Sequence, residues 1–250
     1  MNLNFKKAAM MADFASLVYQ DKEVVEEQLN KLGINNWAWY DKEGTQAFTC
    51  THANTIFIVF RGTEPDQMKD ILADAKAWRK KAREKGLVHF GFAQAIDHVY
   101  DDIVRWISEQ KLDDGFEITC TGHSLGAALA TIMASRLDAH ELYTFGSPRV
   151  GNKAFVKEMD NDNIKHWRFV NNNDIVTKVP FPFIYRHHGQ LVYINHHGNI
   201  RKMTPWQRFK DRWRGRARAL AKGQLFDGIF DHSMDLYYKK LQHVYSESQK

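Results

Sequence analysis

Cysteine is scarce in this chain, with only Cys50 and Cys120 among 250 residues. Two cysteines exclude the dense disulfide framework of a small secreted domain, and no Cys/His run has the spacing of a zinc finger. Glycine and proline are not in excess either, with 15 and 5 residues, which excludes a collagen-like or low-complexity chain. With 44% hydrophobic and 26% charged residues, we expect one packed domain over residues 1–250.

The sequence also lacks a clear membrane-spanning run and a Sec-type leader. Residues 118–135 contain no Asp, Glu, Lys or Arg, but Gly122, Gly126 and several polar residues at the centre argue against a transmembrane helix. Near the N-terminus only five apolar residues separate Lys7 from Asp13, too few for a signal peptide. We therefore expect a cytoplasmic protein without a transmembrane segment, and signal-independent export is the alternative.

Positive charge is concentrated in one segment. Residues 201–222 hold nine basic residues and one acidic residue, a net charge of +8, whereas the whole chain has +5. A helix predicted over 204–222 would place Trp206, Phe209 and Trp213 on one side. Such a basic amphipathic helix either contacts an anionic membrane surface or packs its aromatic side chains into the core. A nucleic acid partner is less consistent with this pattern and is not expected.

Hydrophobic periodicity predicts alternating helices and strands. Apolar residues at steps of three and four predict helices over residues 7–19, 22–32 and 92–110, and an alanine-rich helix over 125–139. The uncharged run Thr55–Phe60 predicts a strand covered on both faces. Further strands are predicted over 116–121, 142–145, 167–170 and 191–194. This alternation predicts an α/β fold with a central, mostly parallel sheet flanked by helices.

The motif Gly122-His123-Ser124-Leu125-Gly126 lies between a predicted strand and a predicted helix. In this context G-x-S-x-G forms a nucleophile elbow, because glycines let the strand and the helix approach closely. The N-terminus of the following helix favours negative charge. A nucleotide-binding turn would instead contain G-x-G-x-x-G or G-x-x-x-x-G-K, and neither occurs. Ser124 is therefore a candidate nucleophile.

Other motifs accompany this one in order along the chain: FRGT, VHFGF, TGHSLGAALA, YTFGSPRVGN, NNNDIV and DHSMDLY. Together with the opening MADFASLVY, they resemble the class 3 (fungal-type) lipase family of the α/β-hydrolase superfamily. The resemblance implies an α/β-hydrolase fold with a lid segment. It also implies a serine carboxylic ester hydrolase of the triacylglycerol lipase type, acting on a lipid ester without a metal or an organic cofactor. Ala127 departs from the family pattern, in which a third glycine is frequent.

The resemblance assigns roles to individual residues. It implies Ser124 as the nucleophile, Asp174 of NNNDIV as the acid and His232 of DHS as the base. The chain order Ser, Asp, His is the order that an α/β-hydrolase requires. His232 would accept the proton of Ser124 while Asp174 fixes the imidazole tautomer. The family also implies an oxyanion hole made by the backbone amides of Thr63 and Leu125.

Two segments leave alternatives open. Residues 64–88 carry an apolar helical stripe that includes Met68, Leu72 and Trp78, and this stripe fits a mobile lid and a packing helix equally well. The basic segment 201–222 favours, as a second function, a phospholipase that acts on membrane lipids and is exported without a signal peptide. A third function is a non-catalytic lipid- or membrane-binding module, which would be expected to have lost a triad residue.

Histidines flank the predicted strand 191–194 on both sides: His187, His188, His196 and His197. Adjacent residues of a strand point to opposite faces, so at most alternate members could share one ion. We therefore expect no metal site at this position.

Overall fold

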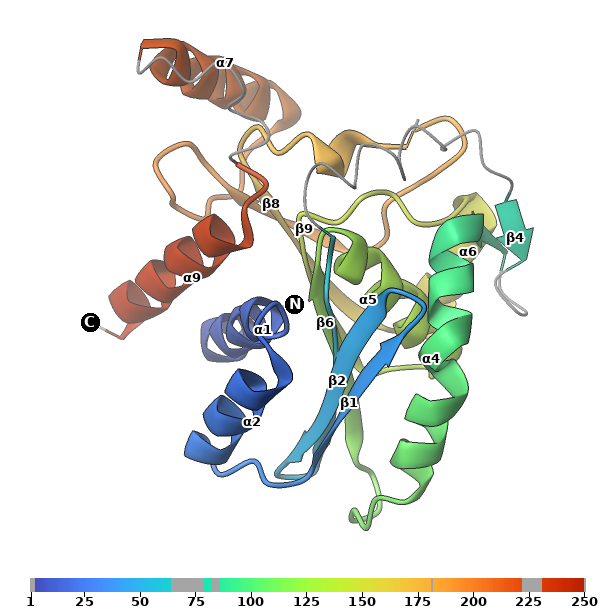
Figure 1. The fold of residues 1–250 in the computed structure, drawn as a ribbon. Coiled ribbons are helices and arrows are strands. Elements are labelled where there is room, and N and C mark those ends of the chain that lie inside the picture. Colours follow the sequence, from blue (N-terminus) through green and yellow to red (C-terminus); the bar gives the residue numbers. More distant parts are fainter. Residues whose placement is uncertain (1–2, 64–78, 82–85, 181, 222–230, 250) are drawn as a thin grey trace.

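A seven-stranded sheet with the order β1-β2-β3-β6-β7-β8-β9 forms the centre of the structure (Figure 1). Its strands are β1 (Trp37–Lys42), β2 (Thr45–His52), β3 (Thr55–Phe60), β6 (Glu117–His123), β7 (Glu141–Phe145), β8 (Lys165–Asn171) and β9 (Gln190–Ile194). Neighbouring strands among β3, β6, β7, β8 and β9 pair in parallel, and β2 and β1 continue the sheet with antiparallel pairing. The predicted α/β fold with a mostly parallel sheet is confirmed.

The computed structural model describes residues 3–63, 79–81, 86–180, 182–221 and 231–249. The apolar stripe of the candidate lid, within residues 64–78, lies outside these residues, as do residues 82–85. The described part of the segment 64–88 contains β4 (Arg79–Lys81), which pairs antiparallel with β5 (Leu87–His89). The choice between a lid and a packing helix therefore stays a prediction.

The hairpin of β1 and β2 was not predicted. Its strands are joined by Glu43 and Gly44, which have φ angles of 48° and 74°. Two consecutive positive φ angles are characteristic of a type I′ hairpin turn, in which Asn-Gly or Asp-Gly is the usual sequence. Because glutamate is uncommon at the first of these positions, the turn has a weak sequence signature.

Helices cover both faces of the sheet (Figure 1). One face is covered by α1 (Phe5–Leu17), α2 (Lys22–Lys31) and α9 (Met234–Ser248), and the other by α4 (Phe90–Ser108), α5 (Leu125–Arg136) and α6 (Lys153–Asn161). The helices predicted in these regions lie within three residues of the observed bounds, whereas α6 and α9 were not predicted. None of the helices in the described part of the chain has the length and apolar character that a membrane crossing requires.

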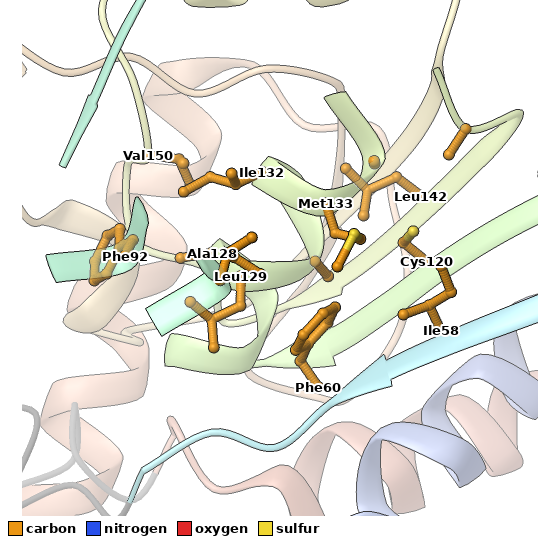
Figure 2. Close-up of a cluster of buried hydrophobic side chains, with 14 of the residues drawn as sticks. Ile58, Phe60, Phe92, Cys120, Ala128, Leu129, Ile132, Met133, Leu142 and Val150 are labelled. Atoms are coloured by element: carbon orange, nitrogen blue, oxygen red, sulfur yellow. The ribbon is translucent and has the colours of Figure 1, made fainter. Parts of the chain in front are cut away.

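The core between the sheet and α5 fixes the start of this helix. Figure 2 shows Phe60 and Cys120 of the sheet facing Leu129 and Met133 of α5. All residues of α5 from 126 to 135 are buried, because small alanines let the helix lie directly on the strands. The N-terminus of α5, at the end of the central strand β6, is therefore held by close packing.

Candidate active site

Ser124 lies in the sharp turn between β6 and α5. Its φ of 57° and ψ of −125° are rare for a residue with a side chain, and such strain is typical of functional turns. A Cβ atom on Gly122 would lie 2.4 Å from the carbonyl oxygen of Gly126, and one on Gly126 would lie 2.2 Å from that of Phe60. The motif glycines therefore allow the close approach of strand and helix that the sequence predicted.

His232 lies between Ser124 and Asp174. Its Nε2 is 2.7 Å from Oγ of Ser124, and its Nδ1 is 3.0 Å from each carboxylate oxygen of Asp174. All three side chains are buried. A carboxylate only accepts hydrogen bonds, so Nδ1 carries the proton and Nε2 can accept the hydroxyl proton of Ser124. The structure thus brings together the three predicted residues in the arrangement of a Ser–His–Asp triad.

Two further hydrogen bonds hold Asp174. The hydroxyl of Tyr237 donates to Oδ2 at 2.6 Å, and the backbone N–H of Val176 donates to Oδ1 at 2.9 Å. Burial and the Asp174 carboxylate raise the pKa of Tyr237 well above its ordinary value, so the hydroxyl stays protonated and donates. Tyr237 was not predicted as a site residue, although it belongs to the DHSMDLY motif.

A second histidine, His123, is hydrogen-bonded to the backbone of His232. Nε2 of His123 is 2.6 Å from the backbone oxygen of His232, and Nδ1 is 2.8 Å from the hydroxyl of Tyr19. The carbonyl can only accept, so His123 donates from Nε2 and accepts from Tyr19 at Nδ1. Burial and the neighbouring His232 lower the pKa of His123 well below its ordinary value, which keeps the ring neutral. Neither Tyr19 nor His123 was predicted as a site residue.

The two predicted oxyanion-hole residues border one cavity of about 530 Å³. Leu125 is the first residue of α5, and Thr63 follows β3. The hydroxyl oxygen of Thr63 is buried and has no hydrogen-bond partner among the described residues. A helix N-terminus and an unpaired hydroxyl both stabilise a negatively charged oxygen. Phe92, Ala95 and Leu129 form an apolar part of the cavity lining, and polar side chains, among them Gln46 and Arg61, form another part.

The histidines around β9 have separate partners. Nδ1 of His188 is 3.0 Å from Nδ1 of His166, and Nε2 of His187 is 2.8 Å from the backbone oxygen of Thr177. Within the described ranges, no group of three or more His, Cys, Asp or Glu residues is arranged to hold a metal ion.

Burial of His123 and His166 makes folding stability depend on pH. Desolvation lowers the pKa of both rings well below the ordinary value. Below about pH 6.5 these histidines bind protons in the unfolded chain but not in the folded protein. The free energy of unfolding therefore decreases as the pH is lowered, by up to ~1.4 kcal/mol per pH unit for each ring. Asp13 opposes this trend below about pH 6, because burial raises its pKa to about 6.

Urea unfolding measured at about pH 7.5 and about pH 5.5 checks this prediction. The midpoint is expected to be lower at the acidic pH, and His166→Gln should reduce the difference between the two midpoints. An equal or higher midpoint at the acidic pH would contradict it.

The basic segment 201–222 forms α7 (Pro205–Ala221), which lies outside the two helix layers (Figure 1). Residue 222 and the side chains of 216–221 lie beyond the described part. Trp206, Phe209 and Trp213 are 62%, 48% and 58% exposed. The interpretation that these aromatic side chains fill the core is therefore wrong, because the helix packs through its other side.

A mostly parallel sheet, a serine elbow after a central strand, and Ser, Asp and His in this order define an α/β-hydrolase. The sequence model described as Lipase (class 3) matches residues 57–184 of the chain. The secreted mono- and diacylglycerol lipase LIP1 of Malassezia globosa is 30% identical over 212 residues, which cover 76% of this chain and 69% of the relative. The chain therefore belongs to the class 3 lipase family.

Two further similarities are to a plant phospholipase, over a shorter part of the chain, and to a solved lipase structure. The chloroplastic phospholipase A(1) DAD1 of Arabidopsis thaliana is 40% identical over 91 residues, covering 34% of this chain and 20% of the relative. A solved triacylglycerol lipase, whose catalytic centre is formed by a serine protease triad, matches with a TM-score of 0.66 and 25% identity over 76% of this chain and 79% of its own. The aligned regions cover between 20% and 47% of the length of three curated relatives, one of which is this phospholipase.

Proposed function

We propose that this protein hydrolyses carboxylic esters of lipids, as a triacylglycerol lipase does, through an acyl-enzyme on Ser124. The observation that carries the proposal is the 2.7 Å contact between Nε2 of His232 and Oγ of Ser124, with Asp174 bonded to the opposite ring nitrogen. This arrangement makes a weak nucleophile reactive, because the imidazole removes the hydroxyl proton as the oxygen attacks. The names of the lipase relatives support the choice of lipid esters.

In the first half of the reaction, Oγ of Ser124 attacks the ester carbonyl and its proton passes to Nε2 of His232. The alcohol then leaves with this proton, and the acyl group stays on the serine. In the second half, His232 takes a proton from water and the hydroxide attacks the acyl carbonyl. The bond between this carbon and Oγ then breaks, His232 returns the proton to Oγ of Ser124, and the carboxylic acid is released. Asp174 stabilises the imidazolium in both halves by accepting from Nδ1.

The negative charge of each tetrahedral intermediate would fall beside the cavity bordered by Thr63 and Leu125. We assign three hydrogen-bond donors to this charge: the backbone amides of both residues and the unpaired hydroxyl of Thr63. The part of the lining formed by Phe92, Ala95 and Leu129 is apolar and suits an acyl chain.

A phospholipase acting on membrane lipids is the second candidate. The exposed aromatic side chains of α7 and the similarity to a plant phospholipase favour it. We also propose a cytoplasmic location, with signal-independent export as the alternative. A non-catalytic binding module is the weakest candidate, because all three triad side chains are present and in contact.

Fatty-acid release followed by pH-stat separates these candidates. The two substrates are emulsified triacylglycerol and vesicles of anionic phospholipid, and Ser124→Ala serves as the blank. Faster serine-dependent release from triacylglycerol supports the proposal, and faster release from vesicles supports the phospholipase. No release from either substrate would contradict both.

Gly146 provides a geometric test of the site. Its φ is 60°, and a Cβ atom would lie 2.8 Å from Oδ2 of Asp174 and 2.9 Å from Nδ1 of His232. Gly146→Ala is therefore expected to displace the acid and the base and to lower kcat about 100-fold on a soluble short-chain ester.

Gly115→Ala is the matched control for this substitution. Gly115 has a similar φ of 80°, but no heavy atom lies within 4 Å of its added Cβ. Both variants carry the same backbone strain, so only the first should lose activity. Equal kcat values for the two variants would contradict the geometry.

A further inference from the structure

One side of α7 is attached to the loops that follow β8 and β9. Oδ2 of Asp211 accepts hydrogen bonds from the hydroxyl of Tyr193 at 3.0 Å and from the backbone N–H of His196 at 3.1 Å. The side-chain amide of Asn173 donates to the backbone oxygen of Arg212 at 3.1 Å. Because Asp211 is buried, turning the helix would break these bonds and expose a paired charge.

Close packing at Gly215 holds the same side of the helix. A Cβ atom there would lie 2.2 Å from the side-chain nitrogen of Asn172. The helix is therefore fixed in its rotation, and its opposite side stays directed away from the protein.

The opposite side carries the aromatic face, defined here as Trp206, Phe209, Lys210, Trp213 and Arg214. The rings of Trp206 and Phe209 stack with centroids 5.4 Å apart, and Phe209 and Trp213 meet edge to face at 6.3 Å. Nζ of Lys210 lies 5.1 Å from the Trp206 ring centre. Together the five residues line a shallow groove of about 590 Å³. Their spacing along the helix places them on one continuous stripe.

This composition fits a lipid surface better than a protein or a nucleic acid. Tryptophan rings favour the boundary between headgroups and acyl chains, and lysine and arginine beside them pair with lipid phosphates. Exposed Arg201 and Lys202 precede the helix and add to the same charge. A nucleic acid would pair its phosphates with the cations, but it would offer no apolar environment to the three aromatic rings.

Helix α7, which carries the aromatic face, is attached next to the loop of the triad acid. Asn173, which bonds to the α7 backbone, directly precedes Asp174 in the chain. Figure 1 shows α7 at the end of the molecule opposite α2. A surface bound to α7 would therefore lie at the same end as the loop that carries the triad acid.

We propose that the aromatic face of α7 docks the protein on an anionic phospholipid bilayer. The rings insert at the headgroup level, and the cations bind the lipid phosphates. This inference deepens the proposed function by naming the surface from which the substrate is reached. Docking itself requires no catalysis, so the two proposals can fail separately.

The test is co-sedimentation of Ser124→Ala protein, which leaves the lipid intact, with vesicles of phosphatidylcholine containing about 30% phosphatidylglycerol or none. We expect at least about tenfold stronger partitioning to the anionic vesicles. Combined Trp206→Ser, Phe209→Ser and Trp213→Ser should weaken partitioning by about 100-fold. Lys210→Glu with Arg214→Glu should weaken it by more than ~25-fold, since each cation at the surface contributes roughly fivefold.

A control variant changes one exposed apolar residue and two exposed cations at the other end of the molecule. Its substitutions are Leu32→Ser, Lys22→Glu and Lys111→Glu. We expect this variant to partition within about twofold of the parent, because the substituted groups do not face the lipid.

Several outcomes would overturn the docking proposal. Unchanged partitioning of the aromatic triple variant would do so, as would binding of a DNA duplex without binding of vesicles. A dimer in sedimentation velocity that the triple variant disperses, again without vesicle binding, would assign the face to a second copy of the chain. Hydrolysis of soluble p-nitrophenyl butyrate by the protein with Ser124 intact is measured in parallel, and its absence would contradict the proposed function alone.

Discussion

Replacing Ser124 with alanine is expected to lower kcat for ester hydrolysis by about 10⁴- to 10⁶-fold. The substitution removes the attacking oxygen, and His232 then has no proton to accept at Nε2. The fold should persist, because the backbone N–H of residue 124 still donates to the carbonyl oxygen of Phe145 at 3.0 Å. Alanine has the same backbone preference as serine at this positive φ, so the elbow gains little additional strain.

The measurement is steady-state hydrolysis of a soluble short-chain ester, with thermal unfolding followed by circular dichroism. Ser108→Ala, at the exposed end of α4, is the control and should retain the parent activity. Turnover by Ser124→Ala within tenfold of the parent would rule out the acyl-enzyme mechanism.

Asp174→Asn is expected to lower kcat by about 10⁴-fold, because it changes the imidazole tautomer rather than the packing. Both oxygens of Asp174 lie 3.0 Å from Nδ1 of His232. An asparagine amide in this position directs N–H groups at Nδ1 and favours the tautomer with the proton on Nε2. That nitrogen then faces Oγ of Ser124 as a donor and cannot remove its proton.

Kinetics on the same ester, together with the urea midpoint, test this second prediction. Exposed Asp113→Asn is the control, and its kcat should stay within about twofold of the parent. A near-normal kcat for Asp174→Asn would show that the carboxylate does not orient the base.

Local sequence patterns predicted the parallel strands of the sheet and the elbow, because these depend on neighbouring residues. The uncharged run of β3 and the glycines around Ser124 carry their structural information within a few positions. The meeting of Asp174 and His232 is different, since it joins distant parts of the chain. It could be anticipated only through the family resemblance of their motifs.

The supporting residues of the site could not be predicted for the same reason. Tyr19 and His123 are 104 positions apart, and Tyr237 reaches Asp174 across 63 positions. Each looks like an ordinary core residue in its own segment, so a local pattern contains no sign of its hydrogen bond. These contacts form because α1 packs against both β6 and α9, which brings the three segments together.

Helix α7 shows a second limit of sequence patterns. Its amphipathic spacing predicted the helix, but two opposite orientations satisfy the same spacing. The structure favours the side with Asp211 and Gly215 as the packed side, because the carboxylate bonds to Tyr193 and glycine permits the approach of Asn172. One buried acid and one glycine thus decide which face remains exposed.

The central claim is that Ser124 is the nucleophile, and covalent labelling tests it most directly. A p-nitrophenyl alkylphosphonate transfers its phosphonyl group to an activated serine oxygen and releases p-nitrophenolate. Peptide mass mapping should place one phosphonyl group on Ser124, and His232→Ala should slow the labelling by several orders of magnitude. Labelling of another residue, or labelling of Ser124 at the same rate without His232, would contradict the account.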